Sequence, residues 1–154
     1  PGGADIGGPT RFVIGVALNP GAVDLERERS RFRWKVEAGA DFAVTQPLFD
    51  VEALNRFLDA THDHPLPILV GLWPFGSLRH AEFLAYEVPG VSVPETILER
   101  MRRAQARGPD AARTEGIAIA REVREAVSAL EPVAGVHVGT PGADVGAALE
   151  VLAP

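Results

Sequence analysis

Two polar side chains, Thr45 and Gln46, follow directly on a short apolar segment in the middle of the chain. Residues 42–44 are apolar at every position, which is typical of a parallel strand covered on both faces. The pair then falls at the carboxyl end of this predicted strand, where α/β folds bind their ligands. An amide such as Gln46 both donates and accepts hydrogen bonds. The pair is therefore the first candidate for a binding site.

The elements that hold this pair in place are indicated by local capping signals. Asp24 is placed to cap a helix that runs to Ala38, and Gly39 follows where a helix end needs a left-handed residue. Asp50 is placed to cap the next helix, which ends near Ala60. The strand with Thr45 thus lies between two predicted helices.

Short apolar runs alternate with amphipathic segments along the rest of the chain. We expect four strands, at residues 12–18, 42–45, 67–73 and 136–138. We expect helices at residues 25–38, 51–60, 77–86, 93–107, 111–130 and 143–152, with Ser92 and Asp110 capping the fourth and fifth. This alternation predicts a parallel sheet with right-handed crossovers. Both a small doubly wound sheet and half of a (β/α)₈ barrel, which needs about 250 residues when complete, fit the pattern.

Composition excludes several classes of protein. Of the 154 residues, 46% are hydrophobic and 23% charged, both ordinary globular values. Fifteen basic residues stand against 21 acidic ones with no basic stripe, which argues against nucleic acid as a partner. The absence of cysteine excludes disulfides and thiolate metal sites. No apolar run reaches the roughly 18 residues of a membrane span.

Isolated residues that could suggest other chemistry have simpler explanations. His62 and His64 lie irregularly spaced in a loop beside a proline, so we expect a solvated loop and no metal site. Trp34 and Trp73 are expected to be packing residues. The chain has fourteen arginines and a single lysine, Lys35, so this lysine is a candidate for a functional role.

Several longer motifs resemble the methylenetetrahydrofolate reductases. The motif sequences are most similar to those of bacterial proteins in which the reductase is fused to a homocysteine S-methyltransferase. The similarity runs in one register from about Gly3 to the carboxyl end. The residues that carry it are 15–20 (GVALNP), 35–50, 71–74 (GLWP), 81–84 (AEFL), 87–94 (EVPGVSVP) and 115–117 (EGI).

The resemblance implies the C-terminal half of a (β/α)₈ barrel, with residues 1–10 as a linker or loop and 11–154 as the partial barrel domain. It implies a cytoplasmic enzyme that uses FAD and reduced nicotinamide, NAD(P)H, to convert 5,10-methylenetetrahydrofolate to 5-methyltetrahydrofolate. The family's Glu-Phe-Phe-Pro-Pro-like run, with its glutamate acid, does not occur here. The isolated chain is therefore expected to be inactive and to need the N-terminal half of the barrel.

Further partners and one alternative complete these expectations. The resemblance implies a folate substrate, a homo-oligomer and a possible methyltransferase domain, with no nucleic acid or membrane partner. The alternative is a non-catalytic half barrel that binds a ligand or dimerises, because two unpaired sheet edges favour self-association.

The resemblance also assigns cofactor-binding positions. Lys35 matches a lysine near the flavin diphosphate, and Glu28 a position close to the flavin's ribose or adenine. Asn19 stands where some members have a tyrosine against the flavin, so a polar contact replaces an aromatic one. Ala17 and Val44 complete the set of residues expected to contact FAD.

Two residues are implied in substrate binding. Gln46 matches the family's glutamine that contacts the folate or nicotinamide stacked on the flavin, so it belongs to both sites. Leu78 aligns with a phenylalanine that packs on folate in some members, and leucine keeps the apolar contact but loses stacking. The resemblance places no catalytic residue and no metal ligand in this chain.

Overall fold

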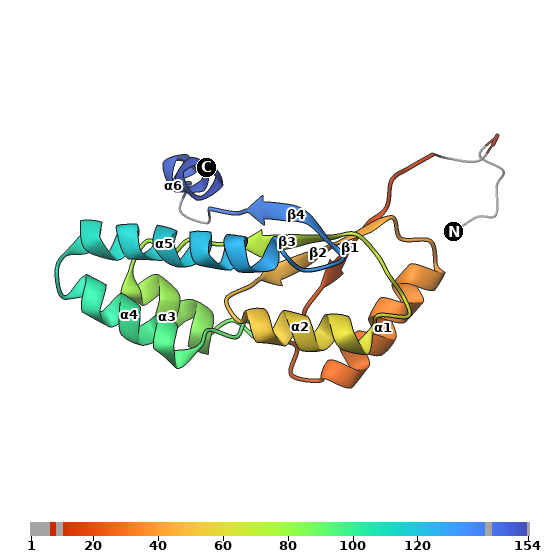
Figure 1. Cartoon of the computed structure of the whole chain (residues 1–154), viewed down its shortest axis with the longest axis horizontal. Helices are drawn as coiled ribbons and strands as arrows, with labels where there is room; N and C mark the ends of the chain where they lie inside the picture. Colours follow the sequence, from red (N-terminus) through yellow and green to blue (C-terminus); the bar gives the residue numbers. More distant parts are fainter. Residues whose placement is uncertain (1–6, 9–10, 141–142, 154) are drawn as a thin grey trace.

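A computed structural model describes residues 7–8, 11–140 and 143–153, and strands alternate with helices through this part of the chain (Figure 1). The strands are β1 (Gly15–Leu18), β2 (Phe42–Pro47), β3 (Ile68–Leu72) and β4 (Val133–Val138). The helices are α1 (Leu25–Glu37), α2 (Val51–Ala60), α3 (Leu78–Tyr86), α4 (Glu95–Gln105), α5 (Pro109–Val127) and α6 (Val145–Leu152).

The four strands form one parallel sheet in the order β1-β2-β3-β4. The prediction of four parallel strands alternating with helices is confirmed. A doubly wound sheet reverses its strand order at a switch point, whereas this order follows the sequence without reversal. The arrangement is consistent with part of a TIM-like barrel, in which each new strand is added on the same side of the last.

Most of the predicted caps are confirmed. The Asp24 carboxylate accepts a hydrogen bond from Arg27 N at 3.0 Å, and Asp50 does the same for Ala53 N at 3.1 Å. Gly39 has a φ of +92°, the left-handed conformation that ends α1. Gly39 and Asp50 bound the loops that enter and leave β2, and Asp24 bounds the loop between β1 and α1.

Two predicted caps are wrong. Helix α4 begins after Pro94, whose extended ψ of 142° places Ser92 outside the helix and without a capping role. Helix α5 begins after Gly108, and Pro109 takes the first helical position, where its missing N–H costs nothing. Asp110 therefore lies inside the first turn, where its charge suits the helix dipole.

Strand boundaries also differ from the predicted ones. Strand β1 begins at Gly15, three residues later than expected, since its pairing with β2 begins there. Strand β4 begins at Val133, three residues earlier, because Val133 already pairs with Ile68. Strand β2 continues to Pro47, so Gln46 belongs to the strand.

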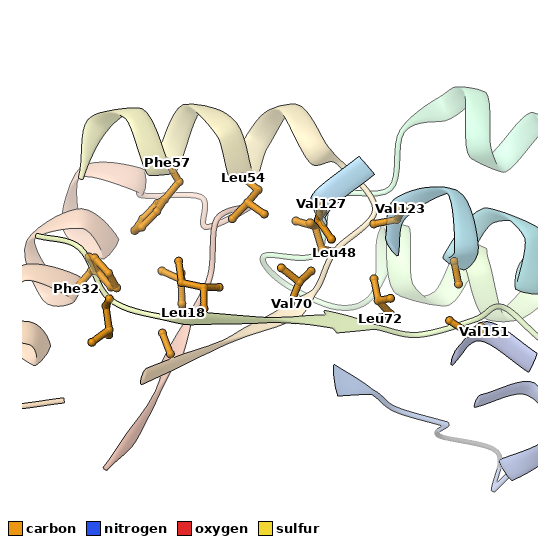
Figure 2. Packing of buried hydrophobic residues seen from close by; sticks show 14 of the residues in the cluster. Leu18, Phe32, Leu48, Leu54, Phe57, Val70, Leu72, Val123, Val127 and Val151 are labelled. Atoms are coloured by element: carbon orange, nitrogen blue, oxygen red, sulfur yellow. The ribbon is translucent and has the colours of Figure 1, made fainter. Parts of the chain in front are cut away.

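The main core lies between the sheet and helices α1, α2, α5 and α6, which cover one face (Figure 2). Ala43 is fully buried on this side, and Phe32, Leu54 and Phe57 pack over the sheet from α1 and α2. A second cluster fills the space around α3 and α4. Residues 42–44 were expected to be covered on both faces, but Phe42 and Val44 remain partly exposed on the other side. In the part of the chain that the structure describes, helices cover one face only.

Exposed apolar side chains gather at both sides of the sheet. Phe12 and Val13 lead into β1 and are 78% and 74% exposed. On α6, which follows β4, Val145, Leu149 and Leu152 are also exposed. Strands β1 and β4 are each paired on one side only within the described residues. No helix in these ranges is long and apolar enough to cross a membrane.

The close approach of α5 to the β3–α3 loop gives a test of this packing. A Cβ at Gly116 would collide with the carbonyl of Phe75, whereas a Cβ at Gly76 meets no atom within 4 Å. For Gly116→Ala we expect the free energy of unfolding to fall by about 2 kcal/mol, because an overpacking cost of about 3 kcal/mol exceeds the gain of about 1 kcal/mol in helix propensity. Urea denaturation measures it. Gly76→Ala should leave the midpoint unchanged, and equal midpoints for both variants would contradict the packing.

Candidate functional site

A β-bulge sits at the pair that the sequence singled out. Between Val44 and Pro47, strand β2 carries one residue more than β3. The Thr45 hydroxyl bridges the irregularity: it accepts a hydrogen bond from Gly71 N at 2.8 Å and donates one to the Gln46 carbonyl at 2.7 Å. Bulges of this kind redirect side chains next to functional sites.

The two polar side chains lie on opposite faces of the sheet, as successive residues of a strand do. Thr45 is buried on the helix side, and Gln46 is exposed on the open side. Gly71 allows this close approach, since a Cβ there would lie 2.7 Å from the Thr45 carbonyl oxygen. Gln46 is therefore presented to a ligand by a buried and fully hydrogen-bonded support.

A hollow of about 480 Å³ opens beside Gln46, within the range typical of small-molecule sites. It lies between the end of β1, one face of α1 and the loop that joins α3 to α4. Its lining residues are Ala17, Leu18, Asn19, Ala22, Val23, Glu28, Arg31, Lys35, Gln46, Pro89 and Gly90.

The charged groups of the hollow are organised around the carboxylate of Glu28. This side chain is only 10% exposed and accepts a hydrogen bond from Asn19 N at 3.2 Å. Lys35 Nζ lies 3.6 Å from Glu28 and donates to the Ala17 carbonyl at 2.6 Å. Arg31 lies 4.0 Å from the same carboxylate. Two cations and one carboxylate leave the lining with one net positive charge in an acidic protein.

The rim of the hollow is formed by main chain from a distant loop. Asn19 Oδ1 accepts a hydrogen bond from Gly21 N at 3.0 Å, which fixes the amide. Its Nδ2 lies against Gly90, where a Cβ would collide with it, and Gly90 has a φ of +81°. The α3–α4 loop is thereby held next to the end of β1.

The structure brings together five of the predicted site residues, Ala17, Asn19, Glu28, Lys35 and Gln46, around this hollow. Val44 lies on the same face of the sheet as Gln46 and pairs with Ala17 of β1.

Leu78 lies elsewhere. It is the first residue of α3, packs on the second cluster, and donates its N–H to the Gln105 side chain at 3.2 Å. It is not among the residues that line the hollow.

Sequence reasoning missed Arg31 and the Pro89–Gly90 rim. Arg31 could have been found, because Glu28, Arg31 and Lys35 follow the spacing of one helix face. The rim belongs to the α3–α4 loop, which is distant in sequence from β1. No local sequence pattern predicts the contact between that loop and Asn19.

The two tryptophans and the histidine loop can also be placed. Trp73 packs on the second cluster as expected. The prediction for Trp34 is wrong: its side chain is 65% exposed on α1. His62 and His64 line a separate hollow at the opposite end of the strands. Within the described ranges, no group of three or more metal-binding side chains lies together.

Parallel βα units in sequence order, with polar groups at the carboxyl ends of the strands, are consistent with part of a β/α barrel. Comparison with known proteins makes this specific. The family model for methylenetetrahydrofolate reductase matches residues 9–145. The chain therefore belongs to the methylenetetrahydrofolate reductase family.

Two similar proteins, one found by sequence and one by fold, add to this comparison. Methylenetetrahydrofolate reductase 2 of Schizosaccharomyces pombe is 34% identical over 113 residues, covering 61% of this chain and 17% of the yeast protein. A protein from Clostridium thermocellum shares the fold with a TM-score of 0.66 at 19% identity, covering 92% of this chain and 51% of its own. Its solved structure is of an uncharacterized protein that binds two copies of 5-methyl-5,6,7,8-tetrahydrofolic acid. The chain thus spans about half of that structure and a smaller part of the yeast protein.

The support of Gln46 by Thr45 can be tested by removing one hydroxyl. Thr45→Val keeps the shape but leaves the Gly71 N–H without its partner. We expect the free energy of unfolding to fall by about 1–3 kcal/mol, the cost of a buried unpaired donor. Thr114→Val is the matched control, since its exposed hydroxyl donates only to the Asp110 carbonyl. Equal urea midpoints for both variants would show that the bridge contributes nothing.

Proposed function

We propose that this chain forms the FAD- and folate-binding part of a methylenetetrahydrofolate reductase. The reaction is the reduction of 5,10-methylenetetrahydrofolate to 5-methyltetrahydrofolate by NAD(P)H. One observation carries the proposal: residues expected to contact the cofactor, spread over β1, α1 and β2, line one hollow at the carboxyl ends of the strands. Family membership and the folate-binding structural relative support it.

The chemistry of the donor set fits a dinucleotide cofactor. Lys35 and Arg31 supply positive charge for a diphosphate, and the Glu28 carboxylate can accept hydrogen bonds from sugar hydroxyls. When bound, the flavin carries the hydride between nicotinamide and folate. The residues of this chain position and orient the reactants.

Gln46 and Leu78 have the roles closest to the substrate. Gln46 stands on the open face beside Val44, so its amide can donate to and accept from a polar ring that lies over the sheet. Leu78 lies beyond the end of β3 at the start of α3 and offers an apolar contact. The two residues mark a substrate path from the centre of the sheet toward α3.

The proposed activity belongs to a larger assembly than this chain. We assign the remaining contacts, including the proton donor, to the N-terminal half of the barrel, and a homocysteine methyltransferase domain to some parent proteins. The isolated chain is expected to bind more readily than it turns over. We place the assembly in the cytoplasm.

Retention of flavin tests this proposal. The purified chain is incubated with FAD, freed of unbound cofactor and examined by visible absorption. We expect a retained flavin band, and we expect Lys35→Ala to weaken FAD binding about 10- to 100-fold, because a charge-assisted hydrogen bond to phosphate is lost. Gln46→Ala should lower retention as well.

Arg103→Ala is the control for charge. Arg103 lies on α4 and pairs with Glu99 on the same helix, so its removal should leave the band unchanged. A colourless wild-type chain, or equal losses in Lys35→Ala and Arg103→Ala, would count against the hollow as the flavin site. Methylenetetrahydrofolate-dependent NAD(P)H oxidation, measured with residues 11–153 exchanged into the yeast reductase, tests the reaction itself.

The alternative function, a dimerising module, is favoured by the apolar side chains at both sheet edges. Light scattering after size exclusion should then give the mass of two chains. Leu149→Glu, on the exposed face of α6, should shift the protein to monomer. Phe83→Glu is the matched control, because Phe83 is also exposed but lies on α3, away from both edges. A weak dimer has a dissociation constant of about 10 μM, so it would be almost fully formed at a protein concentration of about 1 mM. A wild-type chain that is still monomeric at that concentration would exclude the dimerising module.

A further inference from the structure

The four strands of the described sheet contain a single ionisable side chain, His137 on β4. Its neighbours Val136 and Val138 pack against the main core, so the imidazole points the opposite way. This is the open face of the sheet, the face that also carries Val44 and Gln46. The side chain is exposed, and within the described residues its ring forms no hydrogen bond or ion pair. His137 is therefore a polar group that the fold itself does not use.

His137 and Gln46 stand on either side of a glycine. His137 pairs with Gly71 of β3, and the bulge of β2 that carries Gln46 runs along the other side of Gly71. A Cβ at Gly71 would lie 3.3 Å from the Gln46 carbonyl oxygen, so the bulge approaches this glycine closely. Two sheet spacings, about 10 Å, separate β2 from β4. The amide and the imidazole thus flank a position of the sheet that has no side chain.

Two further side chains bound the space around His137. Gly135 and Gly139 lie two residues before and after His137, on the same face of β4. Leu69 lies over Gly135, with its Cδ2 3.5 Å from the position of a Cβ there. The Trp73 indole lies over Gly139, where Nε1 takes the place that a side chain would occupy. Within the described part of the chain, the imidazole thus stands between an apolar side chain and an N–H donor that has no partner.

These groups match the edges of a planar heterocycle. Gln46 and a neutral histidine each donate and accept hydrogen bonds, and the Trp73 indole donates one. A pterin has several donors and acceptors along its rim and two flat faces, whereas nicotinamide has one carboxamide. Three hydrogen-bonding side chains from three neighbouring strands therefore fit a pterin better than a nicotinamide.

We propose that His137 is a further binding residue for the substrate, and that it hydrogen-bonds the pterin ring on the side opposite Gln46. The proposal rests on the proposed function, because the pterin is that of the folate. It places the ring over β3, between β2 and β4. His137 holds this ring in position and takes no part in the transfer of hydride.

Pterin and p-aminobenzoylglutamate, the two halves of a folate, test this role. Each is titrated into the wild-type chain and into His137→Ala, with heat as the readout. We expect His137→Ala to weaken pterin binding about 10-fold, through the loss of one hydrogen bond, and to leave p-aminobenzoylglutamate binding unchanged. His137→Gln should retain most of the affinity, because its amide still donates and accepts. His62→Ala is the matched control, since His62 is also exposed but lies at the opposite end of the strands.

Nuclear magnetic resonance gives an independent readout. The chain has four histidines, and the imidazole signals of His137 are identified by their loss in His137→Gln. Pterin should shift these signals saturably and leave those of His62 in place. Equal pterin affinity in the wild type and His137→Ala, or no saturable pterin binding, would overturn the proposal. Equal losses for both probes with a lower urea midpoint would indicate a structural role for His137 and would overturn it as well.

Two outcomes separate this proposal from the function on which it rests. If FAD is retained but His137→Ala binds pterin as the wild type does, this proposal fails and the flavin site stands. If pterin binding depends on His137 but no flavin is retained and no folate is reduced, the proposed function fails and the pterin site stands. Nicotinamide serves as a third probe. If His137→Ala loses nicotinamide binding and keeps pterin binding, the ring belongs to the other reactant and the proposal is overturned.

Discussion

The carboxylate of Glu28 is the contact on which the candidate site depends. It is almost buried and accepts the Asn19 N–H just beyond β1, while Lys35 and Arg31 of α1 lie near it. A buried carboxylate is stable only when it is paired and hydrogen-bonded, so these partners must stay in place. Glu28 thereby holds α1 against the end of β1 and also orients the two cations of the hollow.

A second constraint acts on the neighbouring strand. The extra residue in β2 is accommodated by the Thr45 hydroxyl, which replaces a ladder contact to Gly71. The main chain of β3 can approach only because Gly71 has no side chain. Gln46 is consequently presented from a rigid element, and rigid elements hold binding groups more closely than loops do.

Local signals in the sequence predicted most of the fold. Asp24, Gly39 and Asp50 bound the helices beside β2, because capping depends on side chains only a few residues apart. Ser92 and Asp110 failed where prolines moved the helix starts. For the site, the resemblance named five of the eleven lining residues, among them Glu28 and Lys35. The Pro89–Gly90 rim was not predictable, since it depends on a contact between distant loops. Trp34 was assigned to the core because the residue type of a single tryptophan does not show whether it is buried or exposed.

The open face of the sheet has a thermodynamic consequence. Phe42, Val44 and Gln46 lie on a face of the sheet that is at least partly exposed, so a ligand on this face is enclosed only when further protein closes over it. Ligand binding and closure then share one equilibrium, and each must strengthen the other by the same factor. Bound cofactor in the cell would stabilise the association of the two parts of the barrel. At low cofactor concentration this association would weaken by mass action.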